Sequence, residues 1–290
     1  MIMIVCVFTV GVRAQIITGQ VLALPDSTPI PYSTLTNQKR GWGVNAGEDG
    51  TFVINYSKER EQDTLLISSI GFDEIRIPYS DLYDNMKVYM KIRPVQLDEV
   101  RIRNNVQITD IWLGSKQNAS VSNICPRGEE SIQEVALFIP NAKNYQGYIT
   151  KVGYYIGDLG KAKTPFRVRI YKNKNGIPGN DLLMENMVIH SNKRNAWRDT
   201  DLNKYNIPIP VDGFFVSMEW IVVPNKKYYV TKKWDDGRVT NEFGQCAGST
   251  NEFEPGYEKI RYNGGQWESY PYRSRNNPRP MFRAQVRIYE

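Results

Sequence analysis

The sequence predicts an all-β protein built from two β-sandwich domains. Short runs of alternating apolar and polar residues follow one another from Gln15 onward, with Gly, Pro, Asn and Asp between them. No long stretch has the 3.6-residue period of an amphipathic helix. The chain has 290 residues, of which 41% are hydrophobic, so it is long enough to bury two ordinary cores.

The first domain is predicted to span residues 15–103. Its clearest strand is 51–56, where Phe52, Ile54 and Tyr56 share one face after a turn at residues 48–50. Similar runs cover residues 16–22, 64–69, 74–78, 87–92 and 98–103. Short strands at this spacing indicate a sandwich.

The second domain is predicted to span residues 123–290, after a linker at residues 104–122. The linker prediction rests on a stretch rich in Asn, Gln, Ser and Gly that holds one apolar island, Ile111 to Leu113. Asn263 and the two glycines after it predict a tight hairpin turn, because these residues tolerate a positive φ. The predicted strands of this domain cover residues 132–139, 149–156, 166–171, 214–223, 228–231, 259–262 and 281–289.

Two predicted strands of the second domain have clearly different faces. Apolar residues at 166, 168 and 170 oppose Arg167 and Arg169, and apolar residues at 282, 284, 286 and 288 oppose Arg283 and Arg287. If both strands belong to one sheet, these arginines and the neighbouring tyrosines form a cationic, aromatic outer surface. A solvated sheet face without function is the other interpretation.

The N-terminal residues 1–14 are predicted to be a signal peptide. An apolar run precedes Val12 and Ala14, which occupy the positions that a signal peptidase inspects before Gln15. The apolar stretch is well short of the roughly 20 residues of a spanning helix, so no membrane span is expected. The predicted location is therefore the periplasm, the outer membrane or the cell surface.

The two cysteines beyond residue 14 are predicted to form a disulfide. Cys125 and Cys246 make an even number in a chain with features of export to an oxidising compartment. Two separate buried thiols are the alternative, because the sequence does not show whether the two Cα atoms lie within about 7 Å.

The charge pattern argues against nucleic acid as a partner. The 37 basic and 31 acidic residues give a net charge of +6, and the two signs are interleaved along the chain. No aromatic and basic RNA-binding signature accompanies the short basic doublets.

Five segments of the first predicted domain carry a resemblance to a known family, in this order: Thr18 to Val21, Pro29 to Leu35, Glu48 to Phe52, Ile67 to Phe72 and Val95 to Val100. Through them, residues 15–103 resemble the carboxypeptidase-regulatory-like domain, a small transthyretin-like sandwich of about seven strands found in exported bacterial proteins. The sequence departs from the family pattern at Ser69 and at Trp42 to Val44, and the resemblance does not imply peptidase activity.

The second predicted domain has a weaker resemblance, carried by Pro165 to Tyr171, Asn175 to Gly179 and Gly213 to Val216. Through these segments, residues 123–290 resemble the jelly-roll sandwiches of exported surface proteins.

The search for catalytic chemistry gives no catalytic residue, metal site or cofactor. The chain has one histidine, His190, which excludes a two-histidine zinc site, and it has no Gly-x-Ser-x-Gly elbow for a serine triad. A carbohydrate-active hydrolase with paired carboxylates needs no histidine and is the alternative function. The candidate carboxylates for it are Asp235, Asp236, Glu252, Glu254 and Glu258.

The predicted function is a non-catalytic binding or structural role in the envelope or at the cell surface, with a polysaccharide or an envelope protein as partner. Tryptophan and tyrosine are concentrated in the last part of the chain, and flat rings beside polar groups suit sugar recognition. Trp234 and Trp267 lie near predicted turns and are the candidate stacking residues, whereas Trp220 lies in an apolar run and is assigned to the core. Arg167, Arg169, Arg283 and Arg287 would favour acidic glycans.

Overall fold

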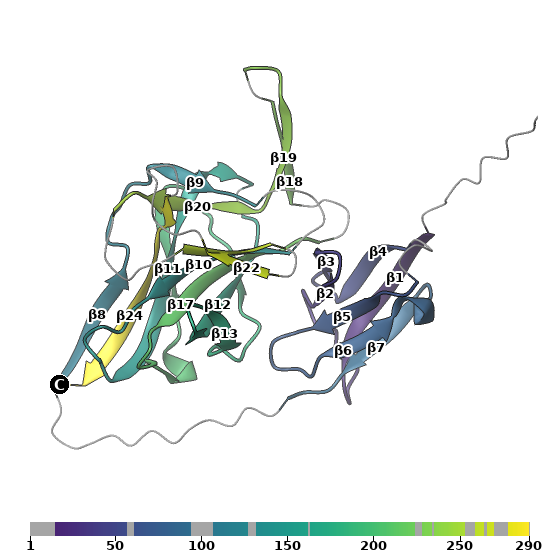
Figure 1. The fold of residues 1–290 in the computed structure, drawn as a ribbon, viewed down its shortest axis with the longest axis horizontal. Helices are drawn as coiled ribbons and strands as arrows, with labels where there is room; N and C mark the ends of the chain where they lie inside the picture. The colour runs from purple at the N-terminus through teal and green to yellow at the C-terminus, as the bar shows by residue number, and fades with distance from the viewer. Residues whose placement is uncertain are drawn as a thin grey trace, which may run out of the picture.

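The computed structural model confirms the predicted fold class. It describes residues 15–56, 61–93, 107–126, 132–161, 163–223, 228–233, 235–252, 259–263, 266–269 and 278–289. These residues form β-strands and two short 3-10 turns, arranged as two β-sandwich domains (Figure 1). The predicted signal peptide at residues 1–14 lies outside the described residues.

The first domain has two sheets, with strand orders β4-β1-β7 and β3-β2-β5-β6. Phe52 and Ile54 are buried between the sheets, as their shared face predicts, together with Ile17 and Leu35. The predicted strand at 98–103 lies outside the described residues. The elements are β1 (Gln15–Ala23), β2 (Thr34–Asn37), β3 (Trp42–Asn45), β4 (Thr51–Tyr56), β5 (Thr64–Ser68), β6 (Ile75–Pro78), the 3-10 turn η2 (Tyr79–Asp81) and β7 (Met86–Met90).

The second domain has a seven-stranded sheet and an eight-stranded sheet. The seven-stranded sheet has the order β13-β12-β17-β10-β21-β22, with β14 also paired to β12. The eight-stranded sheet has the order β23-β20-β11-β24-β8, with β15 and β16 paired to β11 and β9 paired to β20. The hairpin β18-β19 projects away from both sheets (Figure 1).

The strands of the second domain vary widely in length. They are β8 (Ile108–Gly114), β9 (Ser122–Ile124), β10 (Gln133–Ile139), β11 (Gly147–Gly160), β12 (Phe166–Lys174), β13 (Ile177–Asp181), β14 (Val188–Ile189), β15 (Ala196–Asp201), β16 (Ile207–Pro208), β17 (Phe214–Trp220), β18 (Tyr229–Lys233), β19 (Val239–Phe243), β20 (Gln245–Thr250), β21 (Lys259–Asn263), β22 (Gln266–Ser269), β23 (Arg279–Pro280) and β24 (Phe282–Tyr289), with the 3-10 turn η3 (Asn203–Tyr205).

The core of the second domain lies between its two sheets. Phe166, Val168 and Ile170 of β12 point into it from one side, and Phe282 and other apolar residues of β24 point into it from the other. Trp220 is fully buried, in agreement with its place in an apolar run. The alternation along β12 and β24 therefore correctly predicted which of their side chains reach the core.

The predicted linker at residues 104–122 is wrong over its middle part. This segment contains β8, which pairs antiparallel with β24 along its whole length. The apolar island caused the error: Ile111 and Leu113 pack on the core, while Asp110 and Trp112 alternate with them on the outer face. The second domain therefore begins no later than Ile108, well before the predicted boundary at residue 123.

A disulfide joins Cys125 to Cys246, with the two Cα atoms 4.5 Å apart. Cys125 follows β9 and Cys246 lies in β20, and these two strands pair in the eight-stranded sheet. The bond fixes a short strand near the start of the second domain to a central strand of its sheet.

Within the described part of the chain, no helix has the length and hydrophobicity needed to cross a membrane.

Removal of the disulfide should destabilise the second domain. The bond closes a loop with a sequence separation of 121, for which chain entropy gives a stabilisation of about 4–5 kcal/mol. The variant with Cys125→Ala and Cys246→Ala should therefore unfold at a clearly lower urea concentration than the parent. Mass spectrometry after alkylation without reduction tests the bond directly, and two alkylated thiols in protein folded under oxidising conditions would contradict it.

Candidate functional site

A row of charged side chains crosses the outer face of the seven-stranded sheet. Arg167 of β12 lies opposite Glu219 of β17, which lies opposite Glu134 of β10. Their neighbours along each strand point into the core, so alternation turns these three side chains outward. All three are nevertheless buried, with exposed fractions of 2%, 1% and 3%.

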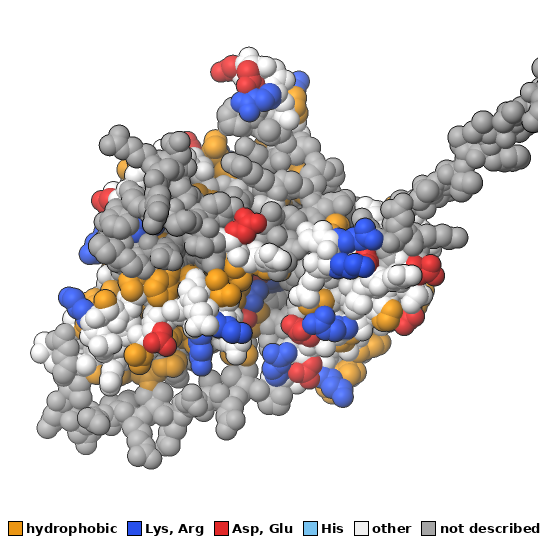
Figure 2. All heavy atoms as spheres, viewed as in Figure 1, with side chains coloured by type: hydrophobic (Ala, Val, Ile, Leu, Met, Phe, Trp, Pro, Cys, Tyr) orange, Lys and Arg blue, Asp and Glu red, His pale blue; other side chains and the backbone are white. Residues whose placement is uncertain are grey.

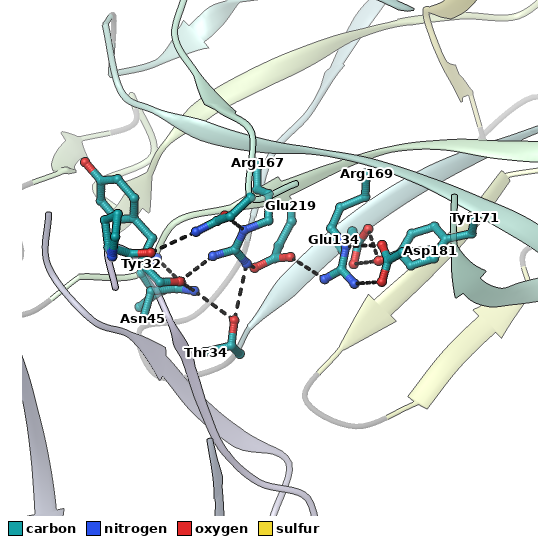
Figure 3. Close-up of polar contacts among 12 residues, drawn as sticks. Tyr32, Thr34, Asn45, Glu134, Arg167, Arg169, Tyr171, Asp181 and Glu219 are labelled. Atoms are coloured by element: carbon teal, nitrogen blue, oxygen red, sulfur yellow. Dashed lines mark hydrogen bonds and ion pairs between the residues drawn. The ribbon is translucent and has the colours of Figure 1, made fainter. Parts of the chain in front are cut away.

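Arg167 connects the two domains. Its guanidinium contacts the Glu219 carboxylate and the Tyr32 carbonyl oxygen, and it donates to Thr34 Oγ1 at 3.2 Å and to Asn186 Oδ1 at 2.8 Å. Tyr32 and Thr34 belong to the first domain (Figure 3). The first domain thus supplies oxygen acceptors that this buried cation requires.

Backbone contacts beside Arg167 hold the same interface. The Asn45 N–H donates to the Val222 carbonyl at 2.6 Å, and the Val222 N–H donates to Asn45 Oδ1 at 2.8 Å. Nearby, a Cβ on Gly43 would lie 2.8 Å from Ile132 Cγ1, so the close approach of the domains requires glycine there. Several independent contacts therefore fix the relative orientation of the domains.

The polar network continues from Glu219 to Arg169, and from there to two further groups. Arg169 donates to Glu219 Oε2 at 2.9 Å and binds Asp181 through two hydrogen bonds of 3.0 and 2.7 Å. Its guanidinium lies 4.8 Å from the centre of the Tyr171 ring, and the Tyr171 hydroxyl donates to Glu134 at 2.8 Å. Figure 3 shows this continuous path from the first domain to Tyr171.

The two buried glutamates have opposite pKa shifts. Burial raises the pKa of Glu134 to about 7, and the negative charge of Glu219 contributes to the rise. Burial acts in the same direction on Glu219, but Arg167 and Arg169 outweigh it and hold the pKa of that carboxyl below its usual value. Glu134 is therefore the group that can take up a proton near neutral pH.

Sequence reasoning missed both glutamates, although each had a visible signal. Glu134 and Glu219 each interrupt a strongly apolar strand, which is unusual unless the charge is paired. A pair of carboxylates with separated pKa values is typical of acid and base catalysis. Here, however, Arg167, Arg169 and Asp181 line the cleft between the domains, and neither glutamate does.

The eight-stranded sheet has a different outer face, on the side of the second domain away from the first domain (Figure 1). The Arg283 guanidinium lies between two indole rings, 4.2 Å from the Trp112 ring centre and 3.9 Å from that of Trp197. Asp199 accepts hydrogen bonds from Arg283 Nε at 3.1 Å and from Nη2 at 2.7 and 2.9 Å. We call Trp112, Arg283, Trp197 and Asp199 the aromatic stack.

A glycine allows the aromatic stack to form. Gly153 of β11 pairs with Asp199 on one side and with Arg283 on the other. A Cβ at Gly153 would lie 2.3 Å from Asp199 Oδ1 and 2.9 Å from Arg283 Cγ. No other residue leaves space for this ion pair to cross the strand.

The predicted cationic surface is wrong, because the arginines belong to different sheets. Arg167 and Arg169 lie in β12 of the seven-stranded sheet, whereas Arg283 and Arg287 lie in β24 of the eight-stranded sheet. The two sheets pack face to face, so the two pairs lie on opposite sides of the domain. Each arginine also has an acidic partner, which for Arg287 is Asp110 at 2.9 Å.

The predicted stacking tryptophans have separate outcomes. Trp267 is half-buried, and its ring contacts the edge of Tyr171 at a centroid distance of 5.9 Å. It therefore lies on the same sheet face as Arg167 and Arg169, joined to Arg169 through Tyr171. Trp234 lies outside the described residues.

The carboxylates considered for hydrolysis do not form a described pair. Asp235, Asp236 and Glu252 are exposed, and Asp236 contacts Arg238 at 2.6 Å, whereas Glu254 and Glu258 lie outside the described residues. His190 is exposed, and its carbonyl oxygen accepts from Arg198. Among the residues that the structure describes, no group of three or more His, Cys, Asp or Glu could hold a metal ion.

Replacement of Arg167 by Met should weaken the contact between the domains. The variant leaves Glu219 buried with one cationic partner fewer, which costs about 3 kcal/mol of the free energy of unfolding. Urea unfolding measures the loss, and small-angle X-ray scattering should show a larger radius of gyration. Arg287→Met is the control, because its pair with Asp110 is partly exposed and contributes at most about 1 kcal/mol. Equal effects of the two variants would contradict the role of Arg167.

Glu134 should make the stability pH-dependent. Folding raises its pKa from 4.5 to about 7, so the folded chain binds the proton more tightly than the unfolded chain. The contribution to stability is complete below about pH 4.5 and is lost as the pH rises through about 7. Glu134→Gln, which keeps the size and removes the titration, should reduce this loss between pH 5 and 8 in urea unfolding experiments. An unchanged slope would contradict the assignment.

No family model and no curated protein matches the sequence. Among solved structures, the cysteine protease and lectin-like domains of Cwp84, a surface-layer-associated protein of Clostridium difficile, align at a TM-score of 0.38 and 11% identity, covering 89% of this chain and 59% of that chain. A structure of the same clostridial protease after propeptide cleavage aligns at a TM-score of 0.38 and 12% identity, covering 89% and 66%. The chain thus spans less than two thirds of the length of either structure. Likenesses this weak identify neither a family nor an activity.

Proposed function

We propose that the protein is a non-catalytic carbohydrate-binding protein of the bacterial envelope or cell surface. The binding surface is the outer face of the eight-stranded sheet, and the aromatic stack is the observation that carries the proposal. Arg283, held by Asp199, fixes the planes of Trp112 and Trp197 on this face. Rigid rings on a sheet provide flat apolar area for sugar rings with little loss of side-chain entropy.

Polar side chains lie beside the aromatic stack in the strand register. Gln285 pairs with Trp112 in the strand register, and Lys151 pairs with Gln285 on the other side. All three side chains are half-buried, so each combines a defined position with an accessible surface. Amide and ammonium groups beside an aromatic ring are a common means of orienting a sugar.

The charges on this face favour a neutral polysaccharide over an acidic one. Arg283 is neutralised by Asp199, and Arg287 is neutralised by Asp110. Lys151 lies opposite Asp201 in the register of β11 and β15. The acidic glycans suggested by the arginine count therefore have no unpaired cationic cluster to attract them among these side chains.

Two observations support an exported location. The disulfide between Cys125 and Cys246 is typical of proteins in oxidising compartments. The first domain resembles the carboxypeptidase-regulatory-like modules of exported proteins, and its fixed contact with the second domain suits a spacer that holds the binding face away from its attachment point.

A hydrolase that uses Glu134 and Glu219 is the second candidate function. The opposite pKa shifts of the two carboxyls favour it, since an acid and a base must differ in protonation. Their burial beneath Arg167, Arg169 and Tyr171 opposes it. Release of reducing sugar by the parent protein, abolished in Glu134→Gln, would favour this function over the binding proposal.

Trp112→Ala should weaken polysaccharide binding by at least tenfold, or about 1.4 kcal/mol, because it removes a half-buried ring from the proposed surface. Affinity electrophoresis against neutral and sulfated polysaccharides measures the effect, and binding of the neutral ones should depend little on salt. Trp267→Ala is the control, a half-buried tryptophan on the opposite sheet. The proposal fails if the parent retains none of the polysaccharides, or if both variants bind as the parent does.

A further inference from the structure

A cleft of about 120 Å³ lies between the two domains. The first domain contributes Ser69, Phe72, Glu74 and Arg93 among others, and the second domain contributes Arg169, Asp181 and Met184. Side chains of both charge signs are interspersed where the domains meet (Figure 2). Clefts at domain interfaces are common positions for small ligands.

The wall from the first domain carries donors without partners. Ser69 Oγ is buried and makes no hydrogen bond within the described structure. Arg93 uses Nε to bind Asp73 at 3.2 Å, and its two Nη groups have no partner among the described residues. A buried hydroxyl without a partner is unfavourable, so a ligand that binds Ser69 would recover this loss.

The wall from the second domain presents a fixed pair of opposite charges. Arg169 and Asp181 bind each other through two hydrogen bonds, and both side chains remain about one fifth exposed, at 19% and 21%. Glu219 also accepts a hydrogen bond from the Arg169 guanidinium. The remaining N–H groups and carboxylate lone pairs form a rigid edge that can both donate and accept hydrogen bonds.

The cleft also has an apolar part. Phe72 and Ile70 of the first domain line it, and Met184 lies on the opposite wall. Gly71 has a φ of +85°, and a Cβ there would lie 3.5 Å from the Met184 carbonyl oxygen. The turn that carries Phe72 thus approaches the second domain closely, in a conformation that favours glycine.

These features select a neutral ligand with several hydroxyl groups. Each charged lining residue has an opposite charge nearby: Asp73 for Arg93, Asp181 for Arg169, Glu219 for Arg167, and Arg76 at 3.7 Å for Glu74. An anion therefore gains little net attraction, whereas hydroxyl groups can donate to the carboxylates and accept from Arg93 and Ser69. The apolar part suits the C–H face of a sugar ring.

The size of the cleft restricts how much of a saccharide can enter. A volume of about 120 Å³ is close to the roughly 150 Å³ of an engineered cavity that holds one benzene ring. The cleft therefore has space for about one ring-sized unit and not for an extended oligosaccharide. We propose that the cleft binds one terminal unit of a neutral saccharide, end-on, between the two domains. It is a second site for the ligand class of the proposed function, and it stands apart from the aromatic stack in position and in residues.

Ligand-observed NMR with neutral methyl hexopyranosides, and with methyl glucuronide as the charged counterpart, tests the full-length protein. At least one neutral glycoside should bind. Ser69→Ala and Arg93→Met should each raise the Kd for that glycoside at least tenfold. Ser69→Ala should keep the parent stability, because the lost hydroxyl makes no hydrogen bond in the described structure. Arg238→Met is the matched control, an arginine 70% exposed near the hairpin tip.

Trp112→Ala separates this proposal from the proposed function. This variant should weaken polysaccharide binding and leave methyl hexopyranoside binding unchanged. Ser69→Ala and Arg93→Met should weaken methyl hexopyranoside binding and leave polysaccharide binding unchanged. Failure of every neutral glycoside to bind, an unchanged Kd in both cleft variants, or tighter binding of methyl glucuronide would overturn the cleft proposal. Loss of polysaccharide binding by the cleft variants together with no effect of Trp112→Ala would overturn the aromatic stack instead.

Discussion

The buried ion pair between Arg167 and Glu219 is the constraint on which the two-domain arrangement depends. Both side chains are almost completely removed from water, and the cost of that desolvation is large unless every polar group finds a partner. Arg167 meets this requirement with the carbonyl oxygen of Tyr32 and the hydroxyl of Thr34, both from the first domain. Separation of the domains would expose an incompletely paired cation, so the pair couples domain orientation to folding. The cleft exists because that orientation is fixed.

The two outer faces of the second domain have different surroundings. On the seven-stranded sheet the polar row is covered and internally paired, and Glu134 with its raised pKa lies within it. On the eight-stranded sheet the aromatic stack is half-buried and lies away from the first domain. The covered face stabilises the molecule, and the other face is available to a ligand. The same alternation of side chains produced both faces, and only their surroundings differ.

Pairing of charges is also the reason for proposing a neutral ligand. Each of the four arginines considered for acidic glycans has a carboxylate partner. Three of these partners lie on a neighbouring strand, and the partner of Arg283 lies across β11. A paired guanidinium still presents N–H groups and a flat surface, but it exerts little long-range attraction. Recognition by such a surface rests on hydrogen bonds and ring contacts, which suits neutral hydroxyl-rich molecules. This reasoning applies equally to the aromatic stack and to the cleft.

The sequence by itself determined the fold class and the inward face of three strands, because period-two alternation is a local property that Phe52, Val168 and Phe282 show directly. It also assigned Trp220 to the core. Only the tertiary structure decided that β8 is a strand of the second domain, that Arg167 is covered, and that Trp112 reaches Arg283. Alternation separates one face from the other, but it contains no information about what covers the outer face. Strand order and domain contact are long-range properties, and they alone determine which polar residues meet solvent and which meet a partner.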